Sequence, residues 1–156
     1  MVCLSLVAFA AGEESGAFAS LANRDMIQVR MTTSCCLPLD ATYLLRFERA
    51  SNPHVTVSEL ERGVVRDRKF VIDTNRIELG ELALTESDLA GLDKLMKFYH
   101  TKHDTLCSVV DRLKIARERD GKIVATEELT DTACSIYQTD YMTFHEIIRR
   151  LRKDKR

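Results

Sequence analysis

The residues best suited to metal chemistry are His100, His103 and Cys107, because imidazole and thiolate are ligands that zinc prefers. If their segment is helical, the three side chains share one face. No second cluster supplies a fourth ligand, and Asp104 is a poor substitute. Histidines on a solvated polar turn are the simpler interpretation, so we expect no cofactor at these residues.

Motifs for nucleotide binding or covalent catalysis do not occur at the glycines. The six glycines, at positions 12, 16, 63, 80, 91 and 121, form no dinucleotide-binding, phosphate-binding or nucleophile-elbow pattern. Carboxylates are plentiful, but no spacing pairs one of them with a histidine. We therefore expect a protein that is not an enzyme and that acts by holding a partner.

Composition bounds the fold and the class of partner. The 156 residues are 45% hydrophobic and 30% charged, which predicts a folded chain with a core. Lys and Arg number 23 against 24 Asp and Glu, so no overall field attracts nucleic acid. Only two prolines and six glycines are present, and this scarcity of turn residues favours helices over many short strands.

The cysteines and the N-terminal run bear on location. Five cysteines at irregular spacing indicate neither a zinc ribbon nor a secreted disulfide framework, so we expect a reducing, cytoplasmic compartment. Residues 1–11 resemble the apolar part of a signal peptide, but they lack preceding basic residues and are too short to cross a bilayer. We interpret them as a core helix and expect no membrane insertion.

Two stretches carry the pattern of amphipathic helices. Thr85 is a good N-cap with acids in the following turn. The apolar stripe behind it consists of Leu89, Leu92, Leu95, Met96 and Tyr99. The C-terminal stripe consists of Phe144, Ile147, Ile148 and Leu151. Residues 119–122 predict a turn, and residues 70–79 have the pattern of two short strands, which we assign to a linker.

A loop pattern occurs twice. In residues 47–60 an aromatic residue precedes a polar loop that begins at Glu48, with Val55 at loop position 8 and Glu59 at position 12. Residues 135–146 repeat it, with Met142 at position 8 and Glu146 at position 12. In calcium-binding loops with this spacing, the residue at position 8 pairs with the corresponding residue of a second loop, and the glutamate at position 12 completes the set of oxygen ligands around the ion.

This repeated frame resembles the EF-hand, and the run from Asp140 to Ile148 resembles the last loop of calmodulin-like proteins and myosin light chains. The family's spacing places two further loops at 11–22 and 99–110. The resemblance implies an all-α protein with four helix-loop-helix units in two lobes. The N-terminal lobe is residues 1–66, a linker or short hairpin is residues 67–84, and the C-terminal lobe is residues 85–156.

Two alternatives stay open. Residues 116–127 also fit an EF-hand loop, although we prefer an inter-loop turn at Gly121 followed by a helix that begins near Thr126. Apolar residues from Leu89 to Leu113 alternate at spacings of three and four, which also predicts one coiled-coil helix over residues 85–117. The second alternative implies an α+β protein that is a structural subunit of a multi-protein assembly.

Calcium binding is not expected, because calcium requires six or more oxygen ligands and no loop has more than two carboxylates at ligand positions. Pro53 replaces the turn glycine of the loop 48–59. That loop is nevertheless the best of the four, and its oxygen ligands would be Glu48, Asn52, Thr56 and Glu59.

The resemblance implies a light-chain-like subunit that clamps an amphipathic, basic (IQ-type) helix of a larger protein such as a myosin heavy chain, in the cytoplasm and associated with the cytoskeleton. An apolar groove would grip this helix. Its lining, or the core beneath it, would be Leu89, Leu92, Met96, Phe98, Met142, Phe144, Ile148 and Leu151. Acids such as Glu86, Asp93 and Glu128 would face the basic helix. The basic residues 149–156 are interpreted as a helix end rather than as a nucleic-acid site.

Overall fold

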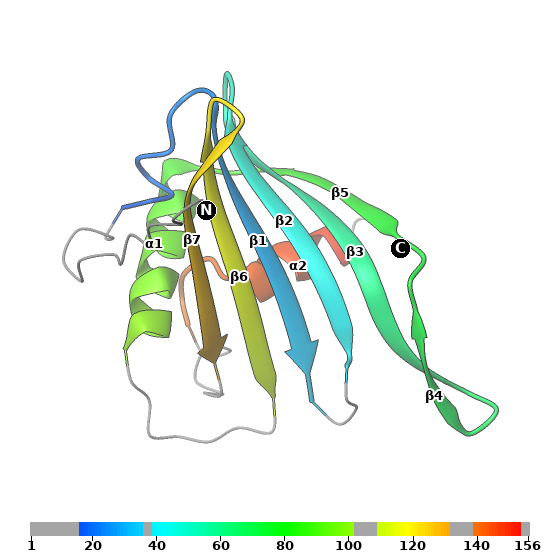
Figure 1. Cartoon of the computed structure of the whole chain (residues 1–156). Helices are drawn as coiled ribbons and strands as arrows, with labels where there is room; N and C mark the ends of the chain where they lie inside the picture. The colour runs from blue at the N-terminus through cyan, green and yellow to red at the C-terminus, as the bar shows by residue number, and fades with distance from the viewer. Residues whose placement is uncertain (1–15, 36–38, 102–108, 132–138, 154–156) are drawn as a thin grey trace, which may run out of the picture.

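The structure is a computed structural model, and it describes residues 16–35, 39–101, 109–131 and 139–153. The elements in chain order are β1 (Asp25–Ser34), β2 (Ala41–Arg49), β3 (Pro53–Arg66), β4 (Lys69–Asp73), β5 (Ile77–Ala83), α1 (Glu86–His100), β6 (Val110–Arg119), β7 (Lys122–Asp131) and α2 (Phe144–Lys153). Seven strands form one antiparallel sheet, and Figure 1 shows both helices on the same side of it.

The strand order is β4-β3-β2-β1-β6-β7, with β5 also paired to β3. Arg62 of β3 is opposite Ala41 of β2 and also opposite Asp73 of β4, so β2 and β4 lie on opposite edges of β3. β5 follows β4 along the same edge and pairs with residues 54–59. Together, β4 and β5 form one edge strand that is interrupted at residues 74–76.

Alternation of side chains along the strands separates the two faces of the sheet. In β1, Ile27, Val29 and Met31 are buried, whereas Gln28 and Arg30 point to the opposite face. This period of two is what a strand with one buried face requires. The buried face carries the helices, and the core lies between them and the sheet.

An aromatic cluster fills the centre of this core. Phe18, which precedes β1, contacts Phe47 of β2 edge to face, with 4.9 Å between ring centroids. Phe144 of α2 lies 6.0 Å from Phe47 and is stacked at 6.3 Å on Tyr99 of α1. One cluster therefore joins the N-terminal segment, the sheet and both helices.

The first helix begins where the sequence predicts. The Thr85 side chain accepts a hydrogen bond from the Asp88 amide at 3.1 Å, and the Asp88 carboxylate accepts one from the Thr85 amide at 2.8 Å. This reciprocal capping box satisfies two amides that the first turn leaves unpaired. All five residues of the predicted apolar stripe are buried, and so are the four of the C-terminal helix.

The prediction of an all-α, two-lobed EF-hand protein is wrong. Residues 47–60 are the end of β2, a turn and most of β3, and Val55 pairs with Phe47 and Leu82 inside the sheet. The three predicted segments all contribute strands to the single sheet, so residues 67–84 are not a linker between lobes. Two strands do form in that segment, but each pairs with β3. Each of the loops 11–22, 99–110 and 135–146 lies partly outside the described residues, and the helix expected over residues 1–11 lies wholly outside them.

The coiled-coil alternative is also wrong. α1 ends at His100 with Thr101 as its C-cap, and β6 begins at Val110. The helix expected from Thr126 is instead β7, which is paired with β6 across the turn at Asp120 and Gly121. These two residues have φ of 50° and 73°, the left-handed pair that closes a two-residue hairpin. The turn over residues 119–122 is thus confirmed, but it joins two strands.

Candidate functional site

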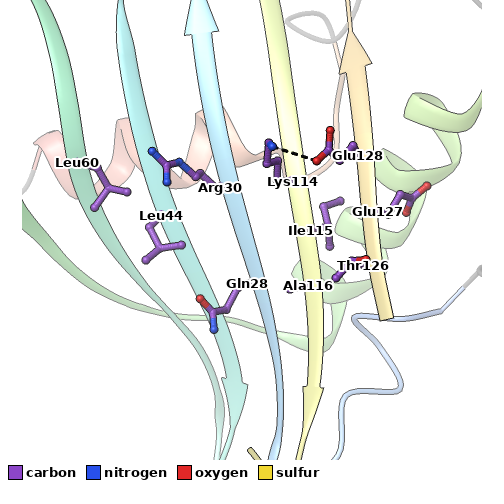
Figure 2. Close-up of a pocket in the computed structure, with 10 residues that line it drawn as sticks. All are labelled: Gln28, Arg30, Leu44, Leu60, Lys114, Ile115, Ala116, Thr126, Glu127 and Glu128. Carbon is purple, nitrogen blue, oxygen red and sulfur yellow. Dashed lines mark ion pairs between the residues drawn. The ribbon is translucent and has the colours of Figure 1, made fainter. Parts of the chain in front are cut away.

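The face of the sheet opposite the helices has no layer over it among the described elements (Figure 1). Side chains of five strands form a groove there of about 570 Å³. Figure 2 shows the residues that line it, with α2 behind the strands: Gln28, Arg30, Leu44, Leu60, Lys114, Ile115, Ala116, Thr126, Glu127 and Glu128.

Apolar side chains contribute most to the lining near β2 and β3. Leu44 and Leu60 are half-buried although no helix covers them. Thr42 pairs with Glu61 and Tyr43 pairs with Glu59, so Leu60 is the extra residue of a β-bulge. A bulge changes the direction of a side chain and bends its strand. Leu60 thereby joins Leu44 in the groove (Figure 2).

Charged side chains border this apolar area. Lys114 forms an ion pair with Glu128 at 3.0 Å, drawn in Figure 2, and Arg30 approaches Glu61 at 3.8 Å. The Lys114 and Glu128 side chains are 68% and 72% exposed. Ion pairs this exposed contribute little to stability. These charges can therefore exchange their partners for those of another molecule at small cost.

A second hollow, of about 370 Å³, lies between α2 and the ends of β1 and β2. Three cations of α2 line it, namely Arg149, Arg152 and Lys153. Arg152 is held by Glu59 and by the Tyr43 hydroxyl, to which it donates at 2.7 Å. Burial raises the pKa of Tyr43, which keeps this hydroxyl neutral. Arg149 is bound in turn by Glu146.

A carboxylate–histidine pair lies at this hollow, whose lining includes His145 and Thr33. His145 Nε2 lies 2.6 Å from the buried Asp111 carboxylate, and Thr33 Oγ1 donates to the other oxygen of Asp111 at 2.8 Å. An Asp–His pair can activate a nucleophile. Neither serine nor cysteine is among the described residues that line this hollow, and its hydroxyl-bearing Thr33 already donates to Asp111. We interpret the pair as a tie between α2 and β6.

The residues predicted to bind a partner pack inside the molecule. Seven of the eight are buried core residues: Leu89, Leu92, Met96, Met142, Phe144, Ile148 and Leu151. The eighth, Phe98, is partly buried against the same core. They lie between the helices and the sheet, so a partner helix could reach them only by displacing α2 or α1.

The oxygen ligands predicted for the loop 48–59 do not converge. Glu48 and Thr56 point to the uncovered face of the sheet, and Asn52 is exposed in the turn between β2 and β3. Glu59 points to the opposite face and is 1% exposed. Its carboxylate forms ion pairs with the guanidinium groups of Arg62 and Arg152. The groups of three or more His, Cys, Asp and Glu that a metal requires do not occur within the described ranges. His103 and Cys107 lie outside those ranges.

The acids expected to face a basic helix have other roles. Asp93 is buried and accepts hydrogen bonds from the backbone amides of Phe18 and Ala19 at 2.9 and 3.0 Å. Glu86 binds Arg49 at 2.7 Å. Glu128 borders the groove of the uncovered face. Sequence reasoning missed this groove, although the alternation of polar and apolar residues in 26–32 and 112–116 was a signal for strands.

No family model, curated protein or solved structure matches this chain. Neither described helix is long and apolar enough to cross a membrane. The function is therefore inferred from the geometry of the two hollows.

Proposed function

We propose that this protein is a non-catalytic domain that binds an amphipathic helix of a partner protein across the uncovered face of its sheet. The observation that carries the proposal is the groove at Leu44 and Leu60, where apolar side chains face outward between exposed ion pairs. This proposal keeps the expectation that the protein holds a partner helix. The proposed binding surface, however, is on the sheet and not on the protein's own helices.

The dimensions of the groove suit a helix. Its lining comes from β3, β2, β1, β6 and β7, and neighbouring strands lie about 4.8 Å apart, so it spans roughly 19 Å. A helix rises 1.5 Å per residue, and roughly 13 residues cover that span. The other face of the same sheet already seats α2 in this manner, since α2 is tied to β6 through His145 and to β3 through Arg152.

Charge favours a partner helix that has both signs. Glu61 on β3 and Glu128 on β7 stand near the two ends of the groove and suit basic residues of the partner. Arg30 and Lys114 lie between them and suit an acidic residue. The partner's apolar residues at spacings of three and four would cover Leu44 and Leu60. A cytoplasmic location remains part of this proposal. The cytoskeletal association depended on the EF-hand resemblance, which the fold contradicts.

The test is a pull-down with the full chain and three variants. Leu44→Asp and Leu60→Asp place a carboxylate in the groove and should reduce recovery of the partner at least about tenfold, because a desolvated charge costs more than about 1.4 kcal/mol. Val124→Asp is the matched control, since Val124 is 54% exposed and does not line the groove. Circular dichroism checks that each variant is folded. If both groove variants are folded and still recover the same stoichiometric partner, the partner does not bind at this surface.

A further inference from the structure

The hairpin of β3 and β4 extends beyond the main sheet. The pairing between β2 and β3 ends at Arg62, whereas the pairing between β3 and β4 runs from Arg62 to Arg66 on one strand and from Lys69 to Asp73 on the other. Figure 1 shows this hairpin projecting from one corner of the molecule. Two-stranded ribbons are marginal by themselves, so another surface against this one would stabilise it.

The ribbon exposes more apolar surface than its size explains. Val65, Val71 and Ile72 are 61%, 41% and 47% exposed, and they are half of the large exposed hydrophobic residues that the described chain contains. Val65 and Ile72 share one face of the ribbon with Phe70, as the pairs Val65 with Phe70 and Gly63 with Ile72 require. A concentrated exposed patch of this kind indicates a contact surface.

The outer edge of β4 is available for pairing. Within the described residues β4 pairs only with β3, so its second row of backbone amides and carbonyls has no strand against it. Proteins commonly protect such edges with charges, prolines or bulges, because an open edge pairs with another chain. The central residues of this edge are Phe70, Val71 and Ile72, which contain none of these features.

We propose that β4 pairs antiparallel with β4 of a second copy of this chain, about a two-fold axis at Val71. The five residues Lys-Phe-Val-Ile-Asp are self-complementary in this register. Lys69 is opposite Asp73 of the second copy, Phe70 is opposite Ile72 of the second copy, and the two Val71 side chains meet on the axis. The axis produces each of the first two contacts twice, as an isologous interface requires.

Charges within the single hairpin favour this pairing. Lys69 stands directly opposite Arg66, and like charges at that position are unfavourable. Asp73, which is opposite Arg62, binds Arg66 farther along the ribbon at 3.1 Å, and in the described part of the chain Lys69 forms no ion pair. In the proposed register the Asp73 carboxylate of a second copy, which also binds Arg66 of its own chain, lies opposite Lys69. The second copy also covers Val71 and Ile72, and it brings both copies of Phe70 and Val65 to the same face.

Sedimentation velocity of the full chain over a concentration series tests the proposal. The wild-type protein should show a monomer–dimer equilibrium. Lys69→Glu and Asp73→Lys each place like charges opposite each other twice, so each alone should weaken dimerisation at least about tenfold. An equimolar mixture should restore it to within about threefold of the wild type, because the heterodimer has two opposite-charge pairs. A folding defect would not be repaired by mixing.

Two further variants separate pairing through β4 from other association. Val71→Lys places two lysines on the axis and should abolish the dimer, while its exposed position leaves the fold intact by circular dichroism. Val124→Lys, at the far hairpin of β6 and β7, should leave the dimer unchanged. A wild-type chain that stays monomeric up to about 1 mM, or a dimer that tolerates Val71→Lys, overturns the proposal. Neither outcome depends on whether a partner helix binds in the groove.

Discussion

The guanidinium of Arg152 and the carboxylate of Glu59 meet at 2.5 Å, although 93 residues separate them in the chain. Glu59 is 2% exposed in its side chain, and Arg62 binds its other oxygen at 2.7 Å. Arg152 also lies 5.4 Å from the centre of the Tyr43 ring. This contact fixes the C-terminal end of α2 on β3, as His145 and Asp111 fix its beginning on β6.

Replacing Arg152 and replacing Glu59 should lower the free energy of unfolding by different amounts. Arg152→Met leaves the buried Glu59 with Arg62 alone and should lower the free energy of unfolding by about 2 kcal/mol, less than the loss of a sole partner. Glu59→Leu should cost about 1 kcal/mol, since the side chain of Arg152 is 43% exposed and can be hydrated. The double variant should lose less than the sum. Urea unfolding of the three variants measures this, and strict additivity would contradict a direct coupling.

Gly63→Ala should destabilise the base of the β3–β4 hairpin. A Cβ atom at this position would lie 1.9 Å from the Leu39 carbonyl oxygen and 2.8 Å from a carbon of the Phe70 ring. Because the nearest atom belongs to the backbone, the loop before β2 must move, and we expect a loss of about 2 kcal/mol. Gly121→Asn is the control, since a Cβ there meets nothing within 4 Å and asparagine tolerates positive φ. Equal melting temperatures for the two variants would contradict this close approach.

Asp93→Ala should detach the segment before β1. Its carboxylate accepts hydrogen bonds from the backbone amides of Phe18 and Ala19. No other side chain of α1 accepts a hydrogen bond from these two amides in the described structure. Buried amides left without acceptors cost about 1–3 kcal/mol. Hydrogen exchange should accelerate selectively at these two amides, with Asp88→Ala, which removes only a helix cap, as the comparison. Unchanged protection at Phe18 and Ala19 would show that the aromatic cluster alone holds the segment.

The lowered pKa of Glu146 predicts that the protein loses stability in acid. Hydrogen bonds from Arg149, and then from Arg150, lower its pKa from 4.5 to about 2. A carboxylate whose pKa is lower in the folded state stabilises the fold fully above its unfolded pKa, and this contribution disappears as the pH falls from about 4.5 to about 2. Glu146→Gln should therefore reduce stability at pH 7 and flatten its decline over that interval. Urea midpoints measured from pH 7 to pH 2 test this, and parallel curves would contradict it.

The sequence determined those features that depend on neighbours in the chain. Thr85 and Asp88 specify the start of α1 because both members of a capping box lie within one helical turn. The stripes of both helices follow from spacings of three and four. Asp120 and Gly121 specify a tight turn because few residue pairs accept positive φ twice.

Only the tertiary structure decided which strands pair and what each side chain meets. Met31 lies opposite Leu113, and Val29 opposite Ile115, because strands far apart in sequence share a register that no local pattern encodes. The same lack of local information explains why residues 47–60 resemble a calcium-binding loop in sequence. Alternating residues such as Val55 and Val57 fit a loop frame as well as a strand, and only pairing with β2 and β5 distinguishes the two. Glu59 could serve as a calcium ligand by its chemistry, but the fold places Arg152 and Arg62 beside it, and those cations determine its role.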